Sequence, residues 1–320
     1  MRLILLVLML GSLMACAPVR EATNVAPDAQ KGGLFGLGIN DNVETSGGAP
    51  VKGGRRAVVP YFKIAFYTEN SPGGYSNNSG DKVIINSKLL GVDAAALQRI
   101  TDAAYKNFKA QMRAKGIEVM PFSALSKSST YQGFKSAKQY VDSALFGPDA
   151  TYVTPTGLRM SDAGIFRVRE IGKVQQEMGV SIVDVQLNLT YLSQSTDSTL
   201  NVVTGISIGQ TLTVTPGSKV DFYGFEESKC NGYCPNIAAH SKLGQPVYIA
   251  KKVGELRNTT TAGDQVSDVA LTALSWMATG TKIRNTNRYE LHAVSSKYEA
   301  VAVDVLEDAT QAMVNALISG

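Results

Sequence analysis

The clearest reactive group in the sequence is the thiol of Cys16, because of what precedes it. An apolar run from Leu3 to Leu13 begins just after Arg2 and leads through small residues to this cysteine. A short cationic head, an apolar middle and small residues at a cut site are typical of a secretory signal peptide. The run is short for a membrane span, which needs about 20 apolar residues. We therefore expect residues 1–15 to be a signal peptide and the chain to be exported.

A second pair of thiols, Cys230 and Cys234, suits an exported protein. The two cysteines flank Asn231-Gly232-Tyr233 and are followed by Pro235. Asn, Gly and Pro favour turns, and a turn can bring two sulfur atoms within bonding range. An even pair in an oxidising compartment predicts a disulfide that closes a small loop without taking part in a reaction.

Two other readings of this pair remain open. A metal site could use Cys230, Cys234 and His240, but it lacks an evident fourth ligand and has unusual spacing for structural zinc. A redox dithiol usually has two residues between its cysteines, whereas this pair has three. We therefore expect no metal at this loop.

Residues suited to catalysis are sparse. The chain has two histidines, His240 and His292, and neither lies in a recognisable motif. The sequence His-Glu-x-x-His is absent, and the Gly-x-Ser-x-Gly match from Gly205 to Gly209 lies within the predicted strand 200–214. These features predict a protein that is not an enzyme, with no catalytic residue and no cofactor. We interpret the acidic residues as helix caps and solvated faces: Asp93, Asp102, Asp184, Asp304, Glu307 and Asp308.

The composition indicates a globular protein with balanced charge. Hydrophobic residues make up 44% of the 320 residues, charged residues 18%, and the formal net charge is +4. The small charge and the expected export both argue against a nucleic-acid partner.

Residues 16–56 resemble a tether rather than a domain. Pairs of glycines are scattered among Asn, Asp, Ser and Pro, and such a segment buries too little apolar surface to offset its ordering entropy. A flexible coil of about 40 residues has a root-mean-square reach of about 35 Å. We expect this tether to precede a globular domain, residues 57–320.

The hydrophobic pattern of residues 57–320 predicts an α/β (α+β) fold with a mixed sheet and packed helices. We expect a right-handed crossover from the first strand through the first helix to a parallel strand at 117–122. We also expect a looser helical region at 123–145, a loop at 147–164 and a turn at 193–198. The predicted strands are 58–68, 82–86, 117–122, 180–192, 200–214, 220–225 and 246–253, with 289–294 ambiguous, and the predicted helices are 93–115, 168–178, 265–277 and 298–317.

The sequence Leu13-Met14-Ala15-Cys16 resembles the lipobox of bacterial lipoproteins. The resemblance implies that the Cys16 thiol is acylated with diacylglycerol, that the chain is cut before it, and that the new N-terminus is acylated too. Ala17 follows, where an aspartate would signal inner-membrane retention in enterobacterial lipoproteins. The resemblance thus implies an outer-membrane anchor facing the periplasm. The alternatives are an ordinary signal peptide or an anchor helix over residues 3–15.

The order of elements resembles the CsgG-like periplasmic lipoproteins, which include the curli secretion pore and activators of penicillin-binding proteins. The matching stretches are Ala94 to Met120, with its Gly-x-x-Val, and Ile171 to Leu192, with its Gly-Val-x-x-Val. The loop at 147–164 and the Cys230–Cys234 segment depart from that pattern.

The two resemblances imply a non-catalytic, lipid-anchored scaffold or assembly factor of an envelope machine, linked to secretion, an appendage or the cell wall. Its partners would be the membrane, through the N-terminal lipid, and envelope proteins or further copies of the chain. The alternative is an oligomeric outer-membrane secretion pore of the CsgG type. In that case the stretch from Thr199 to Thr215, which alternates apolar and polar residues, would insert into the membrane.

Overall fold

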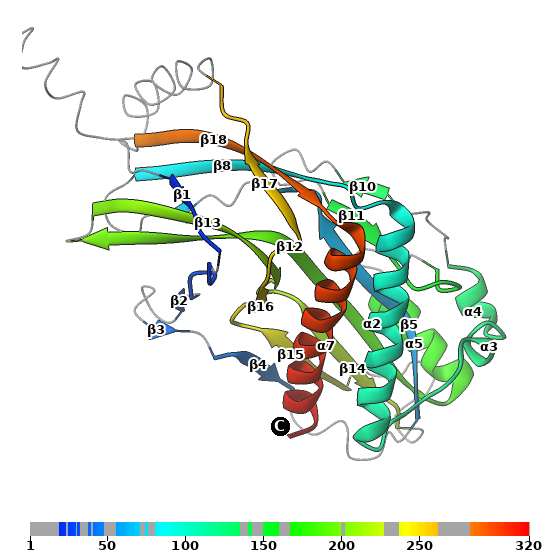
Figure 1. The fold of residues 1–320 in the computed structure, drawn as a ribbon. Helices are drawn as coiled ribbons and strands as arrows, with labels where there is room; N and C mark the ends of the chain where they lie inside the picture. The colour runs from blue at the N-terminus through cyan, green and yellow to red at the C-terminus, as the bar shows by residue number, and fades with distance from the viewer. Residues whose placement is uncertain are drawn as a thin grey trace, which may run out of the picture.

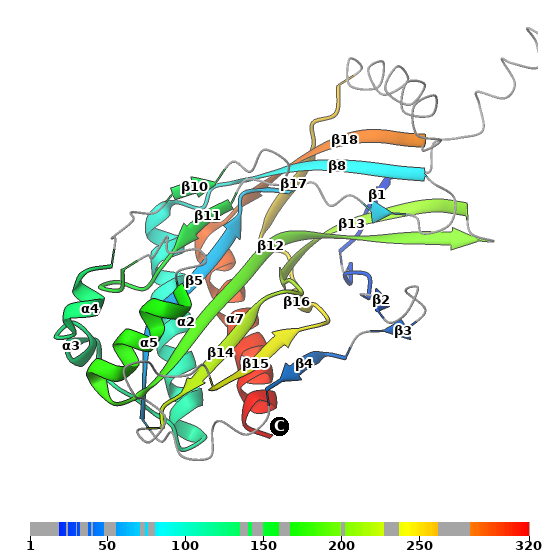
Figure 2. The same ribbon diagram turned by 180° about the vertical axis from the view of Figure 1, so that it is seen from behind.

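The fold was obtained as a computed structural model, and it joins two β-sheets to a layer of helices (Figures 1 and 2). The predicted class, a mixed α/β architecture with helices packed on the sheet, is confirmed. The structure describes residues 19–23, 25–29, 31–32, 38–39, 41–47, 56–70, 74–75, 81–134, 140–142, 150–159, 167–199, 202–226, 237–261 and 282–319.

The larger sheet is built around one long strand, β12. On one side β12 is parallel to β5, and on the other it is antiparallel first to β14 and then to β13. The strands β1 and β16 pair with β13, and β9 pairs with β5. The path through this sheet is β10 (Tyr140–Asp142), β11 (Ala150–Val153), β5 (Arg56–Tyr67), β12 (Ser181–Thr199), β14 (Lys219–Gly224), β15 (Ile237–Leu243) and β4 (Val43–Ser46), with β1 (Val19–Glu21), β9 (Glu118–Val119), β13 (Val202–Val214) and β16 (Val247–Ala250) off the path.

The second sheet has two long parallel strands at its centre, β8 and β18. It is formed by β17 (Gly254–Asn258), β18 (Lys282–Ala293), β8 (Asp81–Leu90), β6 (Glu69–Asn70) and β7 (Gly74–Tyr75). A separate two-stranded pair joins β2 (Lys31–Gly32) to β3 (Gly38–Ile39).

The helices α2 (Ala94–Ala114) and α7 (Ser295–Ser319) lie side by side and run in the same direction across the larger sheet (Figure 1). The Arg99 guanidinium donates to both carboxylate oxygens of Glu299 at 2.9–3.1 Å, and the Asn107 amide donates to Glu307 Oε2 at 2.6 Å. Three further helices are α3 (Phe122–Leu125), α4 (Ser129–Gln132) and α5 (Arg167–Met178).

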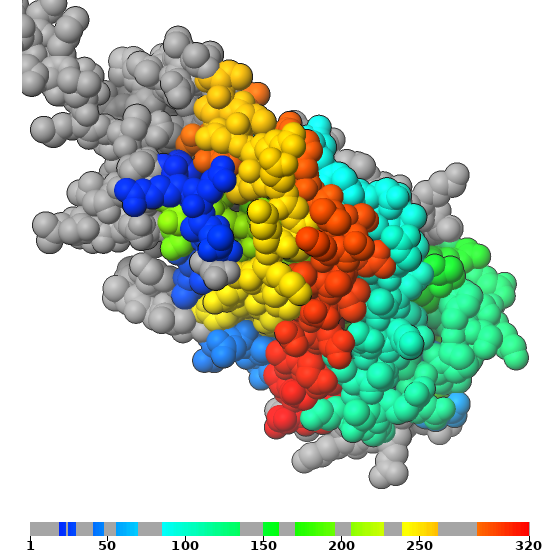
Figure 3. All heavy atoms as spheres, in the orientation of Figure 1, coloured from blue at the N-terminus to red at the C-terminus, as the bar shows by residue number. Residues whose placement is uncertain are grey.

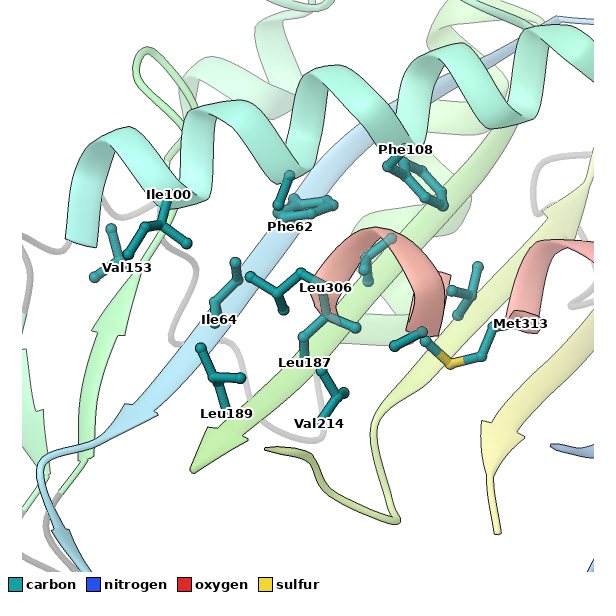
Figure 4. Close-up of a cluster of buried hydrophobic side chains, with 14 of the residues drawn as sticks. Phe62, Ile64, Ile100, Phe108, Val153, Leu187, Leu189, Val214, Leu306 and Met313 are labelled. Atoms are coloured by element: carbon teal, nitrogen blue, oxygen red, sulfur yellow. The ribbon is translucent and has the colours of Figure 1, made fainter. Parts of the chain in front are cut away.

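The core lies between these two helices and one face of β5 and β12 (Figure 4). Alternate residues of β12 face the helices because side chains change face at every step of a strand. These residues, and those of β5, α2 and α7 that meet them, are buried: Phe62, Ile64, Ile100, Phe108, Leu187, Leu189, Leu306 and Met313. The N-cap of α2 is Asp93, whose carboxylate accepts from Ala96 N at 2.7 Å, as expected for this residue.

Most predicted elements agree with the structure, including the parallel pairing of β5 with β9 after the first helix. The predicted loop at 147–164 contains strand β11, so that prediction was wrong there. The predicted turn at 193–198 was also wrong, because β12 continues through these polar residues. Their backbones pair with β13, and Ser193 Oγ lies 3.2 Å from Thr213 Oγ1. Strands β15 and β17 were not anticipated, and the predicted helix at 265–277 lies outside the described residues.

A buried polar contact joins the two sheets. Ser87 Oγ in β8 lies 2.9 Å from the hydroxyl of Tyr191 in β12, and that hydroxyl also donates to the backbone oxygen of Thr68 at 3.3 Å. Tyr191 is fully buried. A buried hydroxyl without a partner costs about 1–3 kcal/mol, so this contact selects one mutual placement of the sheets.

We expect Tyr191→Phe to lower the free energy of unfolding by about 1–3 kcal/mol, because it removes the buried hydrogen bonds that the Tyr191 hydroxyl makes with Ser87 and Thr68. The measurement is urea unfolding monitored by circular dichroism. Tyr248→Phe is the matched control, since Tyr248 is 43% exposed. Adding Ser87→Ala to Tyr191→Phe should cost less than the sum of the two single changes, and strict additivity would contradict the coupling.

The short helix α4 is held by a carboxylate from α5. Glu177 accepts from Ser128 Oγ at 2.6 Å and from the backbone amides of Ser129 and Thr130 at 2.5 and 3.0 Å. The hydrogen bond from Ser128 is the main cause that lowers the pKa of Glu177 to about 2. The ionised carboxylate is therefore the form that favours the contact between α4 and α5.

The stabilisation from Glu177 should be present above its ordinary pKa and be lost as the pH falls towards 2, because the unfolded chain takes up the proton first. The difference in urea midpoint between the native protein and Glu177→Gln should narrow between pH 5 and pH 2. Glu118→Gln, which removes an exposed 3.8 Å ion pair with Arg56, should show little difference at any of these pH values. If the difference in urea midpoint between the native protein and Glu177→Gln stayed constant over this pH range, the ionised Glu177 carboxylate would not be the source of the stabilisation.

Candidate functional site

The residues predicted to carry chemistry fall into two groups. Cys16, Cys230 and Cys234 lie outside the described residues, so the lipidation, the disulfide and the alternatives for the cysteine pair stay predictions. His240 and His292 are described, and their surroundings can be examined directly.

The first feature of functional interest is strand β1, which begins three residues after Cys16. It runs parallel to β13, with Val19 opposite Ile206 and Glu21 opposite Ile208. The amide of Ala22 continues the pairing by donating to the Ile208 oxygen at 2.9 Å. Figure 3 shows this segment, in dark blue, lying against β13, in light green.

Val25 then packs against the face of β13. This side chain is 2% exposed, and the Thr211 hydroxyl donates to the Val25 oxygen at 2.7 Å. A Cβ atom on Gly209 would lie 2.6 Å from Val25 Cγ2 and 2.7 Å from the Ala22 oxygen. Because real Cβ atoms do not approach other atoms so closely, the glycine is what allows the segment to sit there.

Farther along, the same segment forms the edge strand β4, on the same side of β12 as β1. Strand β4 pairs with β15, and the Asn42 oxygen accepts from the amides of Gly244 and Gln245 at 3.1 and 3.3 Å. The expectation that residues 16–56 form a free tether is therefore wrong for β1, β4 and Val25. The segment is poor in apolar residues, but backbone hydrogen bonds to exposed sheet edges order it instead.

The second feature is a polar row on the face of the larger sheet opposite α2 and α7. The strand registers place Tyr61, Asp184, Asp221 and His240 next to one another across β5, β12, β14 and β15. Asp184 and Asp221 are each 2% exposed. The expectation that Asp184 lies on a solvated face was therefore wrong.

Asp221 is the centre of a charged group in this row. Its carboxylate accepts from Lys219 Nζ at 2.6 Å and lies 2.8 Å from His240 Nδ1. The Tyr223 ring meets the His240 ring edge-on, with 6.4 Å between the centroids. The two partners of this carboxylate are about two-fifths exposed, with values of 38% for Lys219 and 43% for His240.

This group can orient an imidazole, which is one part of an acid–base arrangement. A nucleophilic mechanism also needs a hydroxyl or thiol within hydrogen-bond reach of that imidazole. Within the described chain, the ring of His240 is held by a carboxylate and a phenol ring edge. The geometry is that of a compensated charge network joining β14 to β15.

His292 lies in a different and more exposed setting on the second sheet. Its Nε2 atom is 3.0 Å from Glu290 Oε2, and Glu255 lies opposite it on β17. Arg257 donates to Glu255 at 2.7 Å, and this hydrogen bond is the main cause that lowers the pKa of Glu255. The four side chains form a polar surface ladder across β17 and β18.

In the parts of the chain that the structure describes, no three His, Cys, Asp or Glu side chains gather closely enough to hold a metal ion. Among the described helices, none is both long and apolar enough to cross a membrane.

Sequence reasoning missed the buried carboxylates, although a signal for them exists. Asp184 and Asp221 each interrupt a strand of apolar residues, and alternation places both on the face away from α2 and α7. Their burial depends on neighbouring strands and on α5, which donates from Gln175 to the oxygens of Tyr223 and Gly224. These contacts join residues far apart in sequence, so the pattern alone could not reveal them.

Comparison of the chain with protein-family models, with curated proteins and with solved structures gives no match.

We expect Asp221→Asn to lower the free energy of unfolding by about 1–3 kcal/mol, because hydrogen bonds to a charged group are lost while Lys219 and His240 can still be solvated. Thermal unfolding at pH 7 measures the effect. Glu255→Gln, on the exposed ladder, is the control and should change stability by less than about 0.5 kcal/mol. Equal losses in the free energy of unfolding for the two variants would show that the burial of Asp221 does not increase its contribution to stability.

Proposed function

We propose that this chain is a lipid-anchored scaffold or assembly factor of a bacterial envelope machine, held at the outer membrane on the periplasmic side. The observation that carries the proposal is the sequence Leu13-Met14-Ala15-Cys16 after a cationic and apolar leader. Two or three acyl chains on one N-terminus give firm attachment, since each buried methylene contributes about 0.8 kcal/mol. The pair Cys230 and Cys234 would form a disulfide in that compartment.

The surroundings of the histidines support a non-catalytic role. His240 lies beside Asp221 on the neighbouring strand, and His292 lies beside Glu290 on its own strand. We infer that both histidines have structural uses.

The arrangement of elements supports a body of the CsgG-like kind. A strand, a long amphipathic helix and a parallel strand are followed by α5, Gly179 and the long strand β12, in the order expected of that family. A scaffold of this kind would bind envelope proteins or further copies of itself through its surface.

One observation favours the alternative of an oligomeric secretion pore of the CsgG type. The outer parts of β12 and β13 extend well past the helix layer, beside the ends of β8 and β18 (Figure 2). Such projecting strands are where a membrane-inserting region would lie in an assembled ring.

We expect Cys16→Ala to abolish membrane attachment, because the acylated thiol is lost. The native protein should float with membranes in a sucrose gradient, and its N-terminal peptide should carry the diacylglyceryl and acyl masses. The Cys16→Ala protein should be recovered in the soluble periplasmic fraction. Cys230→Ala is the matched control and should still float.

The mass of the native complex, purified from membranes with detergent, then separates the two functions. Recovery of envelope proteins at defined stoichiometry supports the scaffold. Ring-shaped oligomers that conduct ions in planar bilayers would support the pore instead. A native protein that lacks lipid on residue 16 would overturn the membrane anchor in both.

A further inference from the structure

Strand β1 determines how much free chain separates the folded body from a lipid on Cys16. Three Cα–Cα steps of 3.8 Å join Cys16 to Val19, so these two Cα atoms lie at most about 11 Å apart. Val19 is paired opposite Ile206. The attachment point is thus confined to the neighbourhood of Ile206, although residues 16–56 alone predict a reach of about 35 Å.

The direction of β1 shows which end of the folded body lies nearest to the attachment point. Because β1 is parallel to β13, the chain that precedes Val19 leads towards Val202, the first residue of β13. Val202 pairs with Thr199 at the end of the β12–β13 hairpin. The hairpin extends four residues beyond Ile206, or about 13 Å at the usual rise per residue, which is comparable to the reach of the anchor.

The opposite end of the molecule carries α3 and α4, far from β1 in both views (Figures 1 and 2). A bilayer that holds the anchor cannot face that end while β1 stays paired. Pairing is secured by the Val25 contact with Gly209 and by the hydrogen bond from Thr211.

We propose that the β12–β13 end of the body faces the bilayer that holds the anchor, with β1 as the clamp that fixes this orientation. The partner of this end is a lipid surface, and α3 and α4 face away from it. The inference rests on the lipid anchor of the proposed function.

The test uses the full-length, native lipidated protein in vesicles of phosphatidylethanolamine and phosphatidylglycerol that contain an acceptor-labelled lipid. A fluorescent amino acid is placed either at Ser195, opposite Ser207 near the hairpin end, or at the exposed Lys127 between α3 and α4. Energy transfer to the bilayer should be at least twofold more efficient from position 195 than from position 127. The mass of the N-terminal peptide is measured on the same samples.

Val25→Asp should release the segment without changing β13, so the two positions should give similar transfer while the lipid mass is retained. Thr211→Val, which removes the hydrogen bond to Val25, is a milder second variant and should shift the ratio in the same direction. Val294→Asp places a new charge at a residue that is 47% exposed and should keep the native ratio.

Equal transfer from both positions in the lipidated native protein would overturn the orientation and leave the proposed function standing. A native ratio that persists in Val25→Asp would overturn the role of β1. Absence of lipid on residue 16 would overturn the anchor itself, and the orientation with it.

Discussion

The fold depends on the length of β12 and on the change of partners along it. Over its first half β12 lies between β5 and β14, and over its second half it pairs with β13. The first half presents alternate apolar residues to α2 and α7, which close the core. The second half has few apolar residues and keeps its conformation through pairing with β13 and through the contact of Tyr191 with Ser87. One strand thereby connects a helix-covered body to a projecting hairpin.

The two faces of the larger sheet are stabilised by different means. The face towards α2 and α7 excludes water with aliphatic and aromatic side chains, and burial of such surface contributes about 25 cal/mol per Å². The opposite face carries Tyr61, Asp184, Asp221 and His240 in one row, where hydrogen bonds and charge compensation must replace apolar contact. A buried carboxylate such as Asp221 is stable there because Lys219 and His240 lie against it.

The sequence was informative where local periodicity decides structure. The spacing of Leu97, Ile100, Ala104, Phe108 and Met112 predicts α2, and all five are buried. Alternation predicts the first half of β12 in the same way. Sequence reasoning failed where contacts with distant chain segments determine the local structure. The polar end of β12, the strand β11 in a region rich in Gly and Pro, and the pairing of β1 all depend on hydrogen bonds to backbone elsewhere in the chain, which leave no local pattern.

The pairing of β1 with β13 also joins parts of the chain that are made at very different times. Val25 and Thr211, which hold the N-terminal segment in place, are 186 residues apart. Because a chain is synthesised from its N-terminus, Val19–Glu21 exists long before Val202–Val214 follows. During that interval β1 has no strand to join, so this edge of the larger sheet is completed only after β13 has paired with β12.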